Sequence, residues 1–408
     1  MRRLLALLVA LLLVAMLGSL CSCACDDDDD DDDQPGDDDD DDDDEDIQDL
    51  IDQGKHWLEI GEGDKARLVF LEALDVVPGH PEATYGLALA DGLHEMDVIG
   101  IIYDYLMSFI DGSGPVKGED TQGLLDQLLH DVLDGLVIER ADELVSAAQT
   151  AQQAQATFEV EIPMIIGFEE LGYAGSEWDQ ADLLALESFG DLLSGLLKHI
   201  FVIDLNTNLG YIFIFIEMDT SGETIDIVGL VVDVLIQMLT DPAYPDFLTL
   251  DAEGIELYRE AGLQFGLGLD RFLRTFEAIT LETDDQSDDV LGYYDLNGSG
   301  VWDAADPWTI PYYGALDERQ MAWWAVISGI VGAMRDTYLD YTIYDVDPAN
   351  PNPLHFSVFN PLLQMFNLPP LFNEEMTLDI GQWYLNPNPT SIRDGLLQIL
   401  QLVDALLP

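Results

Sequence analysis

The chain has 408 residues, 48 % of them hydrophobic, and its 81 acidic residues against 14 lysines and arginines give a formal net charge of −67. A surface with this charge repels phosphate backbones, so the composition argues against nucleic-acid binding. The body that follows Asp46 carries 63 acidic and 12 basic residues and is long enough to bury one large core or two smaller ones. Solubility, including in salty water, explains such acidity better than a specific basic partner does.

Residues 1–22 have the pattern of an export signal. Two arginines follow Met1, an apolar run extends from Leu4 to Leu17, and small residues come next. The apolar run is too short to span a bilayer, so we expect the signal to be cleaved. The three cysteines all lie between Cys21 and Cys25. Neither a disulfide nor a thiolate metal site is therefore expected in the body.

The segment Leu20-Cys21-Ser22-Cys23 resembles the lipobox of bacterial lipoproteins. The resemblance implies a diacylglyceryl group on Cys23 and a lipid-anchored protein of the bacterial cell envelope, either periplasmic or on the cell surface. Cys21 fits less well because the bulky Leu20 precedes it, and Cys25 lacks an aliphatic residue three positions before it. An ordinary secretory signal with incidental cysteines is the alternative.

Residues 23–46 are expected to form a linker between the anchored cysteine and the body. From Ala24 to Asp46 the chain has 18 acidic residues and no basic one, including two runs of eight aspartates. Self-repulsion of these charges predicts a disordered, extended segment. At roughly 3.3 to 3.6 Å per residue it could span up to about 80 Å, so we interpret it as a stalk.

Residues 47–111 are predicted to begin with helices separated by turns at 61–64 and 78–81. The order of small and aromatic residues there resembles the tetratricopeptide repeat, and it is carried by Gly54, Trp57, Ala66, Phe70, Ala73 and Pro78. Leu50 and Gln53 depart from the pattern, and a second copy is degenerate. The resemblance implies about one and a half repeats. They act either as a peptide-binding surface or as an N-terminal helical cap.

The remaining residues, 112–408, are predicted to be mainly helical. Helices are expected at 122–155, 180–199, 255–279, 316–339 and 391–407, and Gly262 and Gly266 suit close helix packing. Residues 157–162 and 211–216 favour strands of a small sheet, and 345–353 reads as a loop. The apolar segments 225–239 and 322–334 are too short to span a membrane, so they are interpreted as buried helices. The fold class is therefore mainly α, with a small sheet or hairpin.

One twelve-residue segment, from Asp295 to Asp306, has the spacing of a metal-binding loop. It resembles a calcium loop of the EF-hand and dockerin kind, which implies oxygen ligands from Asp295, Asn297, Ser299, the Val301 carbonyl, Asp303 and Asp306. Gly300 would permit the sharp turn, and Trp302 would anchor the loop to the core. A structural Ca²⁺ site is thus expected.

The loop departs from the family pattern in several ways. Asp306 stands where glutamate is usual, and Pro307 and Pro311 oppose a regular helix after the loop. A full EF-hand is therefore not expected, and three carboxylates imply an affinity of roughly 10⁻⁴ to 10⁻³ M. A plain turn is the alternative. Residues 175–182 echo 298–306, and the first copy is explained by an aspartate that caps a helix.

The sequence contains neither the Gly-x-Ser-x-Gly nucleophile elbow of hydrolases nor a phosphate-binding loop. It also lacks the His-Glu-x-x-His motif of zinc-binding helices and the glycine pattern of dinucleotide-binding folds. The six histidines have no ligand spacing and are interpreted as surface or packing residues. These observations favour a binding or structural scaffold, attached to a membrane and open to a protein or peptide partner through the tetratricopeptide-like helices. The alternative is an envelope hydrolase whose carboxylates come from distant segments.

Overall fold

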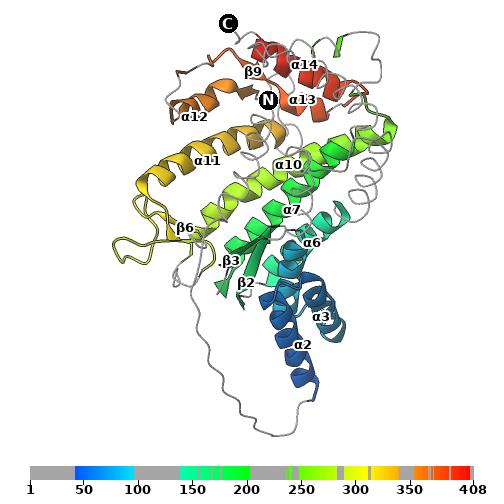
Figure 1. Ribbon diagram of the computed structural model, residues 1–408, viewed down its shortest axis with the longest axis vertical. Helices are drawn as coiled ribbons and strands as arrows, with labels where there is room; N and C mark the ends of the chain where they lie inside the picture. The colour runs from blue at the N-terminus through cyan, green and yellow to red at the C-terminus, as the bar shows by residue number, and fades with distance from the viewer. Residues whose placement is uncertain are drawn as a thin grey trace.

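The computed structural model describes most of the chain after residue 41. The described residues are 42–95, 138–154, 157–166, 169–174, 177–202, 236, 239–240, 248–282, 289–310, 314–339, 353–365, 369–370, 372–385 and 387–404. The expected signal, Cys23 and most of the linker lie outside them, as do the boundary at residue 111, the predicted strand 211–216 and most of the predicted loop 345–353. Figure 1 shows a mainly helical stack, which confirms the predicted fold class.

Three helices begin the described chain, as the sequence predicts. Helix α2 covers Asp42–Glu59, α3 covers Gly63–Val76, and a third helix covers residues 81–95. Helix α2 begins at Asp42, four residues before the expected end of the linker at residue 46.

The middle of the molecule is a layer of long helices (Figure 1). Helix α6 (Ile138–Ala154) packs on α7 (Gln180–Phe201), α7 on α10 (Ala252–Ile279), and α10 on α11 (Glu318–Leu339). Gly262 and Gly266 of α10 face large side chains, since a Cβ would lie 2.2 Å from the Tyr384 ring and 2.6 Å from Leu339 respectively. The predicted close packing at both glycines is therefore confirmed.

The described strands are short and antiparallel. β1 (Phe158–Glu159) pairs with β4 (Glu177–Trp178), and β2 (Ile162–Ile166) pairs with β3 (Glu169–Ala174). The predicted strand 157–162 is thus split between two pairings. A three-stranded sheet has the order β5 (Gly292–Tyr293), β6 (Trp308–Ile310) and β7 (Gly314–Ala315). Its first two strands flank the loop predicted to bind calcium.

The C-terminal elements cover the far end of the stack. They are β8 (Leu354–His355), the 3₁₀ helix η2 (Phe356–Phe359), α12 (Asn360–Met365), β9 (Thr377–Leu378), α13 (Ile380–Leu385) and α14 (Ser391–Asp404). β8 pairs with β9. In Figure 1 these elements lie at the end opposite to α2.

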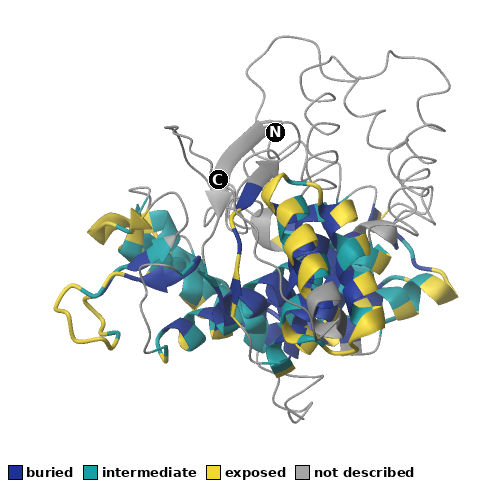
Figure 2. Cartoon of the chain, turned by 90° about the horizontal axis from the view of Figure 1, so that it is seen from below, coloured by how far each residue is buried: buried dark blue, intermediate teal, exposed yellow. Residues whose placement is uncertain are grey.

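Two apolar clusters hold the described part together. The larger joins the three N-terminal helices, α6, the first half of α7 and the β5–β6 sheet, and Tyr85, Phe70 and Phe158 are its largest fully buried side chains. The second joins α10, α13 and the C-terminal elements around Tyr258 and Tyr384. Figure 2 shows buried residues on the inner faces of the helices and exposed ones outside. Among the described residues, no helix is long and apolar enough to cross a bilayer.

Candidate functional site

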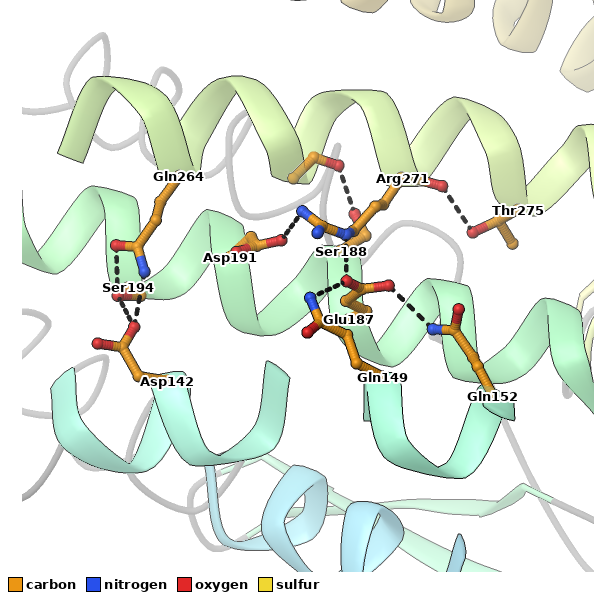
Figure 3. A network of polar contacts seen from close by, with 11 residues as sticks. Asp142, Gln149, Gln152, Glu187, Ser188, Asp191, Ser194, Gln264, Arg271 and Thr275 are labelled. Carbon is orange, nitrogen blue, oxygen red and sulfur yellow. Dashed lines mark hydrogen bonds and ion pairs between the residues drawn. The ribbon is translucent and has the colours of Figure 1, made fainter. Parts of the chain in front are cut away.

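A buried polar network joins α6, α7 and α10 (Figure 3). At one end, the Arg271 guanidinium of α10 forms ion pairs with Glu187 and Asp191 of α7. From α6, Gln149 donates to Glu187 at 2.6 Å, and Gln152 donates to its other carboxylate oxygen at 2.9 Å. Glu187 and Asp191 are 3 % and 2 % exposed. Burial raises the pKa of Asp191 to about 7, although the neighbouring Arg271 opposes the rise.

The same helices share a second polar cluster about two turns away. The Lys198 ammonium lies 3.1 Å from Asp142 Oδ2 and donates to Gln264 Oε1 at 2.7 Å. Ser194 and Gln264 each donate to Asp142 Oδ1 at 2.7 Å. Every charge in this cluster has a partner, which is the condition for a charged group to be buried between helices. The two clusters together fix how the three helices are aligned.

No recognisable motif marks these charged residues. The sequence does place charged residues on helices that are otherwise apolar, and this could have indicated the network. Glu187 and Asp191 are one turn apart on α7, and Arg271 lies within the apolar pattern of α10. A charged residue on a helix predicted to be buried needs a partner. The sequence does not say which residue that partner is.

A groove of about 380 Å³ opens at the end of the first cluster. Its wall is formed by side chains of α6, α7 and α10, namely Gln149, Gln152, Gln153, Gln180, Leu184, Glu187, Arg271 and Arg274. Gln180 donates to the backbone carbonyl of Gln152 at 3.1 Å, which ties the start of α7 to the end of α6. The groove is therefore polar and rests on a buried ion pair.

A second groove, of about 390 Å³, lies between α3, the helix of residues 81–95 and α6. Leu74, Pro78, Leu87 and Ala147 contribute apolar wall, while Arg67, Thr84, Asp91, Glu143, Ser146 and Thr150 contribute polar groups. Arg67 joins the three helices because it lies 2.9 Å from Asp91 Oδ1 and 2.8 Å from Glu143 Oε2. Burial raises the pKa of Asp91 to about 6, against the lowering effect of Arg67. We call this the N-terminal groove.

The residues that carry the tetratricopeptide resemblance meet beside the N-terminal groove. Phe70 is fully buried, and its ring fills the space above Gly54 of α2 and Gly86 of the third helix. A Cβ at Gly54 would lie 2.5 Å from the ring, and one at Gly86 would lie 2.3 Å from it. Ala66 and Ala73 are fully buried on the same helix as Phe70. Small residues thus allow three helices to approach one aromatic side chain.

The predicted calcium loop is a tight turn between β5 and β6, beside the end of α10 in Figure 1. Gly298 and Gly300 both have φ near +70°, a left-handed backbone that glycine adopts readily. Asp295 accepts from the amides of Asn297, Gly298 and Gly300 at 3.1, 2.8 and 2.6 Å. The Gly300 amide is the main cause of a lowered pKa at Asp295.

The other predicted ligands lie in the same turn. Asn297 donates to Asp303 Oδ2 at 2.9 Å, and the Ser299 hydroxyl donates to the Val301 carbonyl at 2.8 Å. Asp306 is fully buried and accepts from the Leu296 amide at 3.0 Å. Trp302 stacks on Trp308 with ring centroids 5.3 Å apart and packs against the larger cluster, which confirms its predicted anchoring role.

The oxygen atoms of this loop can be compared with the ligands that Ca²⁺ prefers. Hard oxygen donors from the six positions lie on one turn, and the glycines supply the curvature that such a site needs. Among the described residues, however, no group of three or more His, Cys, Asp or Glu side chains could hold a metal ion. A calcium ion here would therefore depend on Asn297, Ser299 and the Val301 carbonyl as well as on the carboxylates.

The short internal echo in the sequence has a structural basis. Asp179 caps α7 by accepting from the Ala181 amide at 2.7 Å, while Asp182 Oδ2 accepts from the Asp179 amide at 3.1 Å. Asp303 and Asp306 repeat the arrangement, since Asp306 Oδ2 accepts from the Asp303 amide at 2.8 Å. The predicted capping role of Asp179 is confirmed. Part of the spacing that the two segments share is thus explained by backbone hydrogen bonding alone.

Among the described histidines, His199 is the one most enclosed by aromatic residues. Its ring nitrogens lie 2.6 Å from the Gly195 carbonyl and 2.6 Å from the Tyr384 hydroxyl, and Tyr258 and Phe265 flank the ring. Burial lowers the pKa of His199. A neutral imidazole bonded at both nitrogens serves the packing of α7 against α10 and α13, in agreement with a packing role.

Comparison of the chain with protein-family models, with curated proteins and with solved structures finds no match.

Proposed function

We propose that the chain is a lipid-anchored protein of the bacterial cell envelope whose helical body serves as a binding or structural scaffold. The proposed anchor is Cys23, and the acidic segment behind it is the proposed stalk; both assignments come from the sequence. Calcium held by the loop from Asp295 to Asp306 would stabilise the body. The N-terminal groove would receive a segment of a partner protein.

The observation that carries this proposal is the construction of the N-terminal groove. Arg67 links the three helices through its ion pairs with Asp91 and Glu143. The apolar groove between these helices is therefore already formed before a partner binds. The volume of about 390 Å³ suits one or two side chains of an extended segment. A rigid groove lowers the entropy lost on binding, which favours a recognition role for these helices.

One observation favours a hydrolase as the second candidate. The N-terminal groove brings together two acids from distant segments, Asp91 and Glu143, and the pKa of Asp91 is raised to about 6 by burial. Such a pair could divide the roles of general acid and base. Arg67 lies between the two carboxylates and bonds to both, however, so neither is left to act on a substrate. Binding is therefore the preferred function.

A blocking substitution tests the proposed groove. Ser146 lines it from an exposed position on α6, so Ser146→Trp should fill it without disturbing the core. The matched control is Glu139→Trp, an exposed position on the same helix that lines neither groove. Envelope proteins retained by immobilised wild-type protein and by the control should be missing with Ser146→Trp. Equal retention by all three proteins would rule out the groove as the binding surface.

The anchor is tested separately. Radioactive palmitate should label the wild-type protein in bacteria and should not label Cys23→Ala. Labelling that persists in this variant but is lost in Cys21→Ala or Cys25→Ala would move the anchor to that cysteine. No labelling of the wild type would contradict the anchored location.

A further inference from the structure

The polar groove at α6, α7 and α10 has features of a ligand site that the N-terminal groove lacks. Four glutamine side chains, Gln149, Gln152, Gln153 and Gln180, line it together with Glu187 and Arg274. Glu187 is 3 % exposed and is fixed by Arg271, so the floor of the groove is rigid. At about 380 Å³ the groove is at the lower end of the size range for small-molecule sites.

The glutamines on the groove wall present acceptors. Gln149 and Gln152 each donate an amide N–H to Glu187, at 2.6 and 2.9 Å, and Gln180 donates to the Gln152 backbone carbonyl. Each of these three amide groups uses one of its two N–H donors in this way, and its side-chain carbonyl oxygen is free to accept a hydrogen bond from a ligand. These oxygens require hydrogen-bond donors from that ligand.

Arg274 contributes a positive charge to the groove wall. Of the eleven lysines and arginines in the described part of the chain, nine have an ion pair or a hydrogen bond, while Arg274 and Arg319 have neither. A guanidinium without an acidic partner is unexpected in a chain with 81 acidic residues. Arg271, one turn before it, is already bound to Glu187 and Asp191. Arg274 is therefore the cation available to a ligand in the groove.

We propose that this groove binds a small ligand with a carboxylate flanked by hydrogen-bond donors. Arg274 would take the carboxylate, and the glutamine carbonyls would accept from the donors beside it. Two classes of small molecule carry this combination: a sugar acid, with hydroxyl donors, and an amino acid, with an ammonium donor. The site is lined by other residues of α6 than the N-terminal groove is, and it goes beyond the proposed scaffold function.

Calorimetry on the full-length protein tests the site with defined probes. D-glucuronate and L-glutamate represent the two sources, and D-glucose lacks the carboxylate. We expect one of the two acids to bind in about 0.15 M salt and glucose not to bind. Arg274→Gln should weaken binding at least tenfold, because a charge-assisted hydrogen bond is lost. Arg274→Lys, which keeps the charge but loses the planar fork, should weaken it less.

Arg319→Gln is the matched control, since it removes the same charge from the other arginine without a partner and should leave the affinity unchanged. Gln153→Leu is a second test at an exposed wall position and should also weaken binding. The proposal is overturned if neither acid binds at 10 mM, or if Arg274→Gln binds as tightly as the wild type. It is also overturned if Arg319→Gln loses as much affinity as Arg274→Gln, because general charge would then explain the effect. None of these outcomes depends on the N-terminal groove.

Discussion

Glu95 is a buried carboxylate whose side-chain oxygens have no hydrogen-bond partner among the described residues. Its exposed fraction is 0 %, and burial raises its pKa to about 8, with the nearby Asp91 adding to the rise. A carboxyl with a raised pKa binds its proton more tightly in the folded state. Its contribution to stability is therefore fully present at acidic pH and is lost as the pH rises from about 4.5 through about 8.

We expect the wild-type protein to lose stability between pH 5.5 and pH 8, by up to about 1.4 kcal/mol per pH unit for this one proton. Glu95→Gln keeps the shape without an ionisable group, so it should flatten that dependence and raise the melting temperature at pH 8. Thermal unfolding at a series of pH values measures both. If the variant keeps the wild-type slope, other buried acids such as Asp191 control the pH dependence.

Gly86 tests the packing of the N-terminal helices at the level of one methyl group. A Cβ there would lie 2.3 Å from the ring of the fully buried Phe70, so the ring or the helix must move. Gly86→Ala should destabilise the protein by about 1 to 3 kcal/mol. Gly329→Ala in α11 is the control, because no atom lies within 4 Å of its added Cβ. Alanine is a better helix former, so this control should be neutral or stabilising by up to about 1 kcal/mol. Equal effects in chemical denaturation would contradict the packing.

At the scale of elements, the layer of α6, α7 and α10 depends on Arg271. Arg271→Met would leave Glu187 and Asp191 buried without their cation, which costs about 3 to 5 kcal/mol in comparable cases. The control is Arg259→Met on the same helix, where the ion pair with Glu256 is exposed and is worth less than about 1 kcal/mol. Urea unfolding should separate the two variants clearly. A loss at Arg271 no larger than that at Arg259 would show that the network does not hold the layer.

The loop from Asp295 to Asp306 gives the element-scale prediction for calcium. Millimolar Ca²⁺ should raise the melting temperature, since an ion bound only by the folded state adds to its stability. Asp295→Asn keeps an acceptor for the backbone amides but removes the charge, and it should abolish the rise. Asp75→Asn removes an exposed charge of α3 and should leave the rise intact. If all three proteins shift equally, the ion acts on general acidity.

The long helices were predictable because each repeats an apolar pattern over many turns. The predicted helix 180–199 corresponds to Gln180–Phe201, and 255–279 corresponds to Ala252–Ile279. The pairing of β2 with β3 was not predicted, because a pattern in one strand does not identify its partner. The grooves were missed for the same reason. Arg67 and Glu143 come together across 76 positions, and Arg271 and Glu187 lie on helices whose packing the sequence does not specify.

For the whole molecule, the net charge of −67 should decide how stability depends on salt. Repulsion between like charges favours the unfolded chain, and the screening length falls from about 10 Å at 0.1 M to about 3 Å at 1 M. The buried carboxylates of Asp91, Glu187 and Asp191 are already offset by Arg67 and Arg271, so salt acts mainly on the repulsion between surface charges. Higher salt should therefore stabilise the body.

The location of the aspartate tract determines how much of that repulsion it contributes. Because α2 begins at Asp42, a deletion that leaves the body intact should end at Asp41. Raising NaCl from about 0.1 M to about 1 M should increase the melting temperature by at least about 3 °C in both the wild type and a variant lacking Asp26 to Asp41. A stalk separated from the body by more than a screening length cannot affect the unfolding of that body. If the deletion removes most of the salt dependence, the tract lies against the helices, and the interpretation of the tract as a stalk is wrong.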